Sequence, residues 1–192
     1  MIYINDEPQL LPLNDALAEL SEQRREQALR YKHEQGRRLC VAAYLLLKEG
    51  LLQEYGISEL PLFGYHDNGK PYLADHPDIF FNLSHCRRGA ICALSTSPVG
   101  VDMESIREYR QSLADYTMNA DEAARIAASA QPDLAFTQLW TMKESLLKLT
   151  GQGISTDMKD VLTKAEGRVR FTTVVNRQKQ YVYTVCTNRE QP

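Results

Sequence analysis

Two short segments hold the residue types best suited to chemistry, Gly100–Glu104 and Trp140–Lys148. The first carries two carboxylates in an apolar frame, and the second carries one carboxylate and two lysines. These five ionisable side chains are Asp102, Glu104, Lys143, Glu144 and Lys148. Three carboxylates and two ammonium groups in one cleft would suit a divalent cation that holds a phosphorylated substrate. Whether they can share a cleft depends on the elements that carry them.

The first segment reads as the end of a β-strand, in which successive side chains point to opposite faces. Asp102 and Glu104 therefore share one face, while Val101 and Met103 face the other way. Two carboxylates on one face repel each other unless they reach water or a cation lies between them. Hard oxygen ligands favour Mg²⁺ or Mn²⁺ over zinc. A solvated polar face at a strand end would give the same pattern, so this segment alone leaves both interpretations open.

The second segment is predicted to lie in a helix over residues 136–150. Glu144 and Lys148 are four positions apart, so they lie on one side of that helix, with Trp140 one turn earlier. An exposed Glu–Lys pair, worth roughly a few tenths of a kcal/mol, would look the same. Together with the strand carboxylates, however, Glu144 completes a candidate three-carboxylate metal site, with Lys143 and Lys148 beside it.

A third polar segment, Phe81–Arg88, places a hydroxyl, an imidazole and two guanidinium groups at the end of another predicted strand. Ser84 and His85 could donate hydrogen bonds to phosphate oxygens. The alternative is a turn in which the serine has a capping role. No Ser-His-Asp arrangement is indicated, because nothing marks Ser84 as a nucleophile on a strained strand-to-helix turn.

Composition limits the function classes. The chain has 192 residues and a net charge of −3, so it offers no general basic field for nucleic acid. Its one basic excess lies between residues 22 and 48. Four cysteines without metal-ligand spacing indicate buried thiols rather than zinc or disulfides, and no apolar run reaches the roughly 20 residues of a membrane span. A reducing cytoplasm fits this pattern.

The order of helix followed by strands occurs twice, which is typical of an α+β fold. The first run has helix from 14 to 54, with breaks near Ser21 and Gly36, and strands at 79–84 and 90–95. The second follows a strand at 99–104, with helices at 117–130 and 136–150 and closing strands at 168–175 and 180–187. We expect two lobes, 1–98 and 99–192, that meet near Pro98. Residues 109–116 are interpreted as either a mobile loop or a plain connection.

Four of the chain's motifs occur together in one family. Phe81–His85, Gly100–Glu104 and Trp140–Lys148, with Gly69–Pro71 upstream, have the order and spacing of the 4′-phosphopantetheinyl transferases. The chain resembles the longer, monomeric surfactin-synthetase-activating (Sfp) type over roughly residues 30–150. The resemblance implies two similar α/β lobes related by a pseudo-two-fold axis, with coenzyme A in the cleft between them. It also implies Mg²⁺-dependent transfer of phosphopantetheine from coenzyme A to a serine of an apo acyl or peptidyl carrier protein, releasing adenosine 3′,5′-bisphosphate.

The resemblance also implies roles for individual residues. The implied ligands of Mg²⁺, or alternatively Mn²⁺, are Asp102, Glu104 and Glu144. The implied phosphate contacts are Lys143, Lys148, Ser84 and His85. The nucleotide end and its 3′-phosphate would be held by Lys70 and an arginine, either Arg38 or Arg30. The implied catalytic residues are Glu144, which takes the serine proton directly or through a bound water, Lys148, which steadies or protonates the leaving phosphate, and Asp102.

Two other functions remain open at this point. A catalytically silent module that binds coenzyme A or a carrier protein would keep the fold, but it would be free to lose the carboxylates and Lys148, which are all present. An unrelated Mg²⁺ phosphotransferase that uses nucleoside triphosphates is disfavoured, because the chain has no Walker-type or kinase glycine loop. We therefore expect a monomeric cytoplasmic enzyme with neither a nucleic-acid nor a membrane partner.

Overall fold

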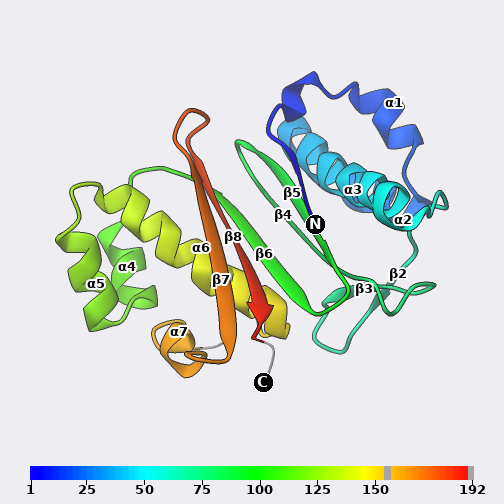
Figure 1. Cartoon of the computed structure of the whole chain (residues 1–192). Coiled ribbons are helices and arrows are strands. Elements are labelled where there is room, and N and C mark those ends of the chain that lie inside the picture. Colours follow the sequence, from blue (N-terminus) through cyan, green and yellow to red (C-terminus); the bar gives the residue numbers. More distant parts are fainter. Residues whose placement is uncertain (154–156, 190–192) are drawn as a thin grey trace.

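The computed structural model describes residues 1–153 and 157–189 and has the predicted α+β composition (Figure 1). The first half of the chain contains β1 (Ile2–Asn5), the short helix η1 (Pro8–Leu10), α1 (Leu13–Ala18), α2 (Glu22–Leu29), α3 (Glu34–Tyr55), β2 (Phe63–Tyr65), β3 (Pro71–Leu73), β4 (Phe80–Cys86) and β5 (Gly89–Ser95). The second half contains β6 (Val99–Ser105), α4 (Gln111–Thr117), α5 (Ala120–Ala127), α6 (Pro132–Thr150), α7 (Val161–Lys164), β7 (Val169–Asn176) and β8 (Tyr181–Asn188).

The predicted boundary between 1–98 and 99–192 falls in the connection from β5 to β6. Residues 154–156 and 190–192 of the second predicted lobe lie outside the described residues. The division into two lobes related by a pseudo-two-fold axis stays a prediction, so the two parts are called the first half and the second half below.

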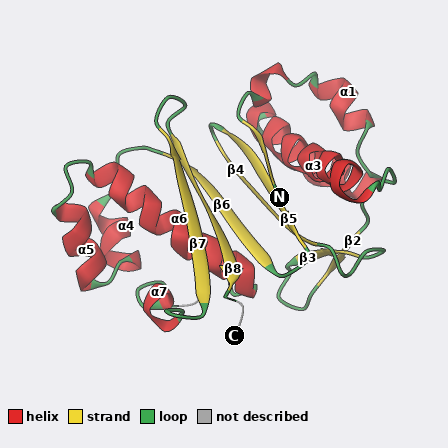
Figure 2. Cartoon of the chain, viewed as in Figure 1, coloured by secondary structure: helices red, strands yellow, loops and turns green. Residues whose placement is uncertain are grey.

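Two antiparallel sheets occupy the middle of the molecule, and each is covered on its outer side by one long helix (Figures 1 and 2). The strand orders are β1-β5-β4 and β6-β8-β7. α3 packs against the first sheet and α6 against the second. An apolar core lies between the sheets and includes the fully buried side chains of Ile91, Val101 and Met103. The predicted alternation along β6 is therefore confirmed, because Val101 and Met103 face this core.

Side chains of β4 join the two sheets where β4 runs beside β6. Asn82 Oδ1 accepts a hydrogen bond from the Val101 amide at 2.8 Å, and Ser84 Oγ accepts one from the Met103 amide at 3.2 Å. Buried backbone amides need partners, and these two side chains supply them. Polar residues of the first half therefore hold β6 in place on either side of Asp102.

Two predictions of local structure are wrong. Gly36, predicted as a helix break, lies inside α3, where a Cβ would come within 2.7 Å of Tyr31 Cδ1. This glycine makes room for the tyrosine ring, and the second break comes instead at residues 30–33. Residues 109–116, predicted as a loop, enter α4 at Gln111, because Ala114 is buried and the Tyr109 ring stacks on Phe136 at 5.3 Å.

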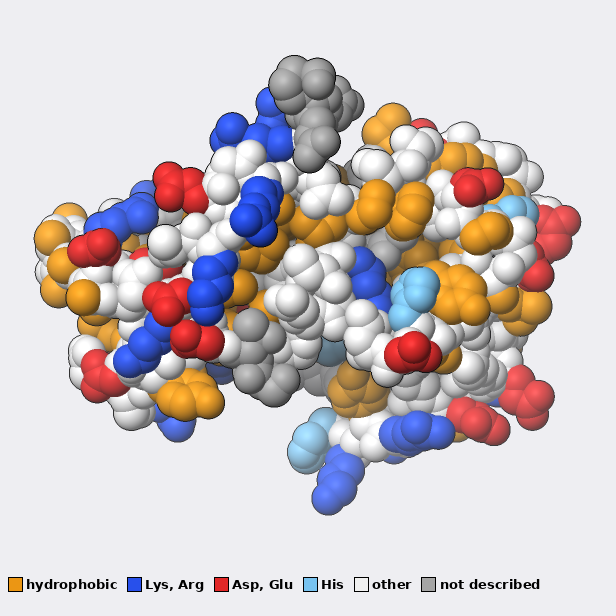
Figure 3. Space-filling view, turned by 90° about the horizontal axis from the view of Figure 1, so that it is seen from below, with side chains coloured by type: hydrophobic (Ala, Val, Ile, Leu, Met, Phe, Trp, Pro, Cys, Tyr) orange, Lys and Arg blue, Asp and Glu red, His pale blue; other side chains and the backbone are white. Residues whose placement is uncertain are grey.

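The face seen from below in Figure 3 carries acidic and basic side chains interspersed with hydrophobic ones across both halves. This mixed surface agrees with the small net charge of −3. Within the described residues, every helix is too short or too polar to cross a lipid bilayer.

Candidate active site

The helix α6 lies directly on β6, and Gly100 makes this close approach possible. A Cβ at position 100 would overlap the carbonyl oxygen of Ser145 and come within 2.5 Å of the Leu149 amide nitrogen. Only glycine lets the strand and helix backbones come this close. Asp102 and Glu104 share the face of β6 with Gly100, so they are directed toward α6.

A cavity of about 670 Å³ lies where the two halves meet, and it gathers most of the predicted site residues. The predicted residues on its wall are Lys70, Ser84, His85, Asp102, Glu104, Glu144 and Lys148. The first three come from the β2–β3 turn and β4, and the other four come from β6 and α6. Segments that are distant in the sequence thus converge on one cavity.

Lys148 lies at the centre of the polar contacts in this cavity. Its ammonium donates to Asp102 Oδ1 at 2.7 Å and to Ser84 Oγ at 2.9 Å. Ser84 Oγ in turn donates to Asp102 Oδ1 at 3.0 Å. The Asp102 side chain is only 5% exposed, so this ion pair is less screened by water than one at the surface. Lys148 therefore pairs with the strand carboxylate, and not with Glu144 of its own helix.

The carboxylates of the cavity are short of partners. Asp102 Oδ2 and Glu144 Oε1 are buried and have no hydrogen-bond partner among the described residues. Burial, followed by the negative charge of Asp102, raises the pKa of Glu104 to about 7 and also raises the pKa of Glu144. Unsatisfied buried oxygens are costly, and hard oxygen donors of this kind suit a divalent cation.

These carboxylates do not form a closed metal cage by themselves. Within residues 1–153 and 157–189, no group of three His, Cys, Asp or Glu side chains is arranged to hold an ion. One reason for the incomplete cage is that Lys148 Nζ donates a hydrogen bond to Asp102 Oδ1, so only Oδ2 of this carboxylate is available to a cation. Mg²⁺ usually keeps several waters and binds through one or two carboxylates plus substrate phosphates. Two unpaired carboxylate oxygens therefore fit such an ion.

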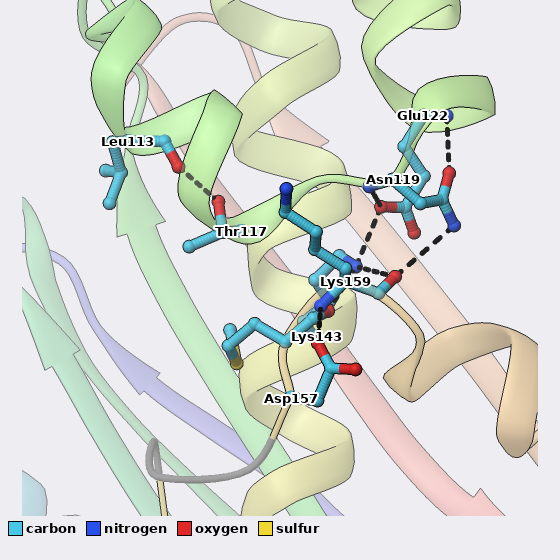
Figure 4. A network of polar contacts seen from close by, with 8 residues as sticks. Leu113, Thr117, Asn119, Glu122, Lys143, Asp157 and Lys159 are labelled. Carbon is cyan, nitrogen blue, oxygen red and sulfur yellow. Dashed lines mark hydrogen bonds and ion pairs between the residues drawn. The ribbon is translucent and has the colours of Figure 1, made fainter.

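Lys143 is absent from the cavity wall, so the structure does not bring it together with the other residues predicted to contact phosphate. Its ammonium is 0% exposed, pairs with Glu122 at 2.7 Å and donates to the carbonyl oxygens of Met158 (2.6 Å) and Lys159 (3.2 Å) (Figure 4). Asn119 caps α5 and also donates to the Lys159 carbonyl at 3.3 Å. Consecutive helical residues project about 100° apart. The Glu144 side chain therefore points toward the cavity, and the Lys143 side chain points toward α5.

Arg38, predicted to hold the nucleotide end, is likewise not brought to the cavity. Arg38 pairs with Glu34 at 2.7 Å and donates to the carbonyl oxygens of Gln9 and Leu11. The i,i+4 spacing in α3 supplies this carboxylate, and Arg38 is absent from the cavity wall, as is the alternative Arg30. Lys70 does line the cavity, but its ammonium donates to the Leu149 carbonyl oxygen at 2.9 Å.

The basic residue that lines the cavity from the first helices is Arg24, which the sequence did not single out. It is 7% exposed, and its guanidinium lies 5.5 and 5.4 Å from the ring centres of Tyr44 and Phe63. Its Nε has no hydrogen-bond partner within residues 1–153 and 157–189. In the described part of the chain no carboxylate pairs with it. A buried guanidinium without a counter-ion is costly, so Arg24 suits an anionic ligand.

His85 lies on the same wall, with its Nε2 atom 3.5 Å from the Tyr31 hydroxyl. Burial, followed by the positive charge of Lys148, lowers the pKa of its imidazole. The ring is therefore neutral near pH 7 and offers one N–H donor and one acceptor.

A second cavity of about 420 Å³ adjoins the first, because Glu104 and Trp140 line both. Its wall includes stacked rings: Tyr109 on Phe136 at 5.3 Å, and Phe136 on Trp140 at 6.1 Å. A partly apolar hollow thus leads away from the polar residues around Lys148.

Fold and cavity together define an α+β protein whose polar cleft suits a phosphorylated substrate and a divalent cation. Comparison with known proteins then identifies the family. The model of the 4′-phosphopantetheinyl transferase superfamily matches residues 98–190. The 4′-phosphopantetheinyl transferase psf-1 of Bacillus pumilus is 31% identical over 159 residues, which cover 77% of this chain and 68% of that protein. The chain therefore belongs to the 4′-phosphopantetheinyl transferase superfamily.

Two proteins of Bacillus subtilis extend the similarity over most of the chain. One, a 4′-phosphopantetheinyl transferase, is 28% identical over 180 residues, covering 91% of this chain and 80% of its own length. The other, 4′-phosphopantetheinyl transferase Sfp of strain 168, is 27% identical over 170 residues, which cover 86% of this chain and 76% of that protein. The predictions of family and enzyme class are confirmed, and the silent module is not favoured. The roles of the individual residues stay predictions.

Proposed function

We propose that this chain moves 4′-phosphopantetheine from coenzyme A to a serine hydroxyl of an apo acyl or peptidyl carrier protein and releases adenosine 3′,5′-bisphosphate. The observation that carries the proposal is the contact of Lys148 with both Asp102 and Ser84, beside two buried carboxylate oxygens that have no partner in the described structure. Phosphoryl transfer depends mainly on positioning and charge stabilisation, so the protein need not supply a nucleophile. This cavity offers cations, hydrogen-bond donors and a base in one place.

Glu144 is the base in this proposal. Its Oε1 atom is buried and has no partner, and burial followed by the charge of Asp102 raises the pKa of its carboxyl group. The raised pKa makes it a better proton acceptor near neutral pH. As the carrier serine oxygen bonds to the phosphorus, its proton passes to Glu144, directly or through a water. The bond from phosphorus to the bisphosphate oxygen breaks, and Lys148 stabilises or protonates the leaving phosphate.

Asp102, Glu104 and Glu144 would hold the divalent cation, Mg²⁺ or alternatively Mn²⁺. When bound, such a cation neutralises charge on the diphosphate oxygens. Lys148, Ser84 and His85 contribute a positive charge and hydrogen-bond donors to the same phosphates. Arg24, in place of Arg38, would hold the nucleotide end, because its buried guanidinium lines the cavity without a counter-ion.

The remaining features of the proposal concern the substrates and the setting. The pantetheine arm would extend into the second cavity, whose stacked rings match its partly apolar character. The four cysteines are free and buried, which fits a reducing cytoplasm. We propose a monomer that meets its carrier protein transiently.

A mass-spectrometric assay tests this function. The protein is incubated with Mg²⁺, coenzyme A and several apo carrier proteins, and the carriers are then weighed. We expect a gain of one phosphopantetheine on the carrier serine, which is lost with a chelator or in Asp102→Ala. The control is Asp75→Ala, an exposed carboxylate away from the cavity wall, which should keep the activity. Coenzyme A binding without any gain on any carrier would contradict the proposal and favour the silent module.

A further inference from the structure

The end of α6 in the second half is held by the β2–β3 hairpin of the first half. The last carbonyl groups of a helix have no partner within the helix, and that of Leu149 accepts a hydrogen bond from Lys70 Nζ at 2.9 Å. The same ammonium lies 3.5 Å from the carbonyl oxygen of Val99, the first residue of β6. A cation is also favoured at the negative end of the helix dipole.

A second residue of the hairpin turn lies close to the residue that caps the helix. α6 ends at Thr150, and Gly151, which has a φ of +72°, is its left-handed C-cap. A Cβ at Gly151 would overlap the side-chain amide of Asn68, so the two residues are packed closely. Asn68 Oδ1 in turn accepts a hydrogen bond from the Lys70 amide at 3.0 Å, which fixes the turn that presents the lysine.

This contact lies next to the centre of the candidate site. Lys148 directly precedes Leu149, and its ammonium reaches Ser84 and Asp102 at 2.9 and 2.7 Å. We infer that Lys70 is a positioning residue: by binding the carbonyl oxygens of Leu149 and Val99 it holds the last turn of α6, and therefore Lys148, in register with β4 and β6. The catalytic consequence of this inference rests on the proposed function. The contact of Lys70 with the two carbonyl oxygens does not depend on that function.

The inference differs from the role that the family resemblance implies, in which Lys70 contacts the nucleotide directly. In that case its loss would weaken nucleotide binding by about tenfold or more, as for a charge-assisted hydrogen bond. A residue that acts through Lys148 should instead change the rate of transfer, because small displacements of catalytic groups cost about 10²-fold in rate. Direct contact therefore predicts a change mainly in the Kd of the nucleotide, whereas positioning predicts a change mainly in kcat.

The test compares Lys70→Met and Lys70→Arg with the unchanged protein. The matched control is Lys164→Met, an exposed lysine of α7 away from the cavity wall. Three quantities are measured for each: the Kd of adenosine 3′,5′-bisphosphate by calorimetry, kcat with coenzyme A and an apo carrier protein, and amide hydrogen exchange in the last turn of α6.

For Lys70→Met we expect kcat to fall about 10- to 100-fold, the Kd to change less than about threefold, and exchange at residues 147–150 to rise. Lys70→Arg, which keeps N–H donors, should recover most of kcat, and Lys164→Met should match the unchanged protein. A Kd raised tenfold with unchanged exchange would overturn the inference in favour of direct binding. If the unchanged protein transfers nothing, the proposed function fails, while exchange at the end of α6 still decides whether Lys70 holds it.

Discussion

At the scale of single residues, the site contains several buried carboxylates, and burying these charges destabilises the folded protein. Lys148 compensates one oxygen of Asp102, whereas Asp102 Oδ2 and Glu144 Oε1 are left without partners. Glu104 is affected most clearly, because burial and then the charge of Asp102 raise its pKa to about 7. A protein selected only for stability would not keep three such groups together. Their cost is consistent with a bound cation offsetting it during the reaction.

The raised pKa of Glu104 predicts how stability changes with pH in the absence of metal. Between pH of about 4.5 and 7 the folded protein keeps a proton that the unfolded chain releases, so the free energy of unfolding falls as the pH rises. The full cost, on the order of 3 kcal/mol, is present above that range. Glu104→Gln should remove it and stabilise the metal-free protein at pH 8, as measured by urea unfolding. Parallel pH profiles of the two proteins would contradict this.

The proposed base gives a second prediction at the same scale. Glu144→Gln keeps the shape of the side chain but cannot accept the serine proton, so kcat should fall by about 10²–10⁴-fold. The Kd of adenosine 3′,5′-bisphosphate should change little, because the nucleotide end is proposed to lie against Arg24. Single-turnover transfer to an apo carrier protein measures the rate, with the exposed Glu166→Gln as control. Full turnover by Glu144→Gln would show that another group takes the proton.

At the scale of elements, the position of α6 depends on contacts on two of its sides. Lys143 and Glu122 form an ion pair with exposed fractions of only 0% and 7%, and Gly100 lets β6 approach from another side. These two contacts fix the rotation and the distance of the helix relative to its neighbours. Glu144 and Lys148 are thereby directed at the cavity.

The buried pair predicts a non-additive pattern of stability. Lys143→Met leaves the Glu122 carboxylate buried without a counter-ion and should cost about 3–5 kcal/mol. Adding Glu122→Gln removes that charge while a glutamine can still serve the capping box with Asn119. The double variant should therefore be more stable than Lys143→Met alone, which a double-mutant cycle from urea unfolding measures. Additive losses would contradict the role of the pair as a compensated buried charge.

Gly100 predicts a steric effect of similar size. Gly100→Ala would place a methyl group against the backbone of Ser145 and Leu149, and overpacking of this kind costs about 1–3 kcal/mol or more. Because neither backbone can move without displacing α6, transfer activity should fall together with stability. The control for stability is Gly153→Ala, where nothing lies within 4 Å of the added Cβ. Thermal unfolding compares the two variants, and the carrier assay compares Gly100→Ala with the unchanged protein. A Gly100→Ala protein with normal stability would rule out the close contact.

The local sequence patterns predicted the strand β6 and the helix α6 well. They did not predict which side chains from distant parts of the chain pair with one another. The alternation over 99–104 fixed which residues of β6 face the core, and helical spacing put Glu144 and Lys148 on one side of α6. The direction of the Lys143 side chain is set by its ion pair with Glu122, which lies twenty-one positions earlier in the sequence. No helical or strand periodicity links the two residues. Arg38 and Arg24 look alike in the sequence. Only the structure shows that Glu34 pairs with Arg38, while Arg24 lines the cavity with no carboxylate partner in the described part of the chain.

At the scale of the whole molecule, the two halves are tied at both ends of β6. At its first residue, Val99, the tie is Lys70 with the end of α6. At its last residue, Ser105, which is paired with Tyr181, the tie is Asp6 of the first half. Asp6 accepts hydrogen bonds from Lys179 Nζ at 2.7 Å and from the Tyr181 hydroxyl at 3.1 Å. Asp102 and Glu104, which line the cavity, lie on β6 between these two ties.

The tie at Asp6 predicts a stability that disappears in acid. Burial alone would raise the pKa of Asp6, but the hydrogen bonds from Lys179 and Tyr181 outweigh it and lower the pKa below its ordinary value of 3.8. A lowered pKa means that the stabilisation is present above pH of about 4 and is lost as the pH falls through the folded-state pKa. Asp6→Asn should therefore lower the urea midpoint at pH 7, and the gap to the unchanged protein should close as the pH falls below the folded-state pKa of Asp6. Asp75→Asn, an exposed carboxylate, should show no gap at either pH, whereas a gap that stays constant down to low pH would mean that the Asp6 charge does not hold the halves together.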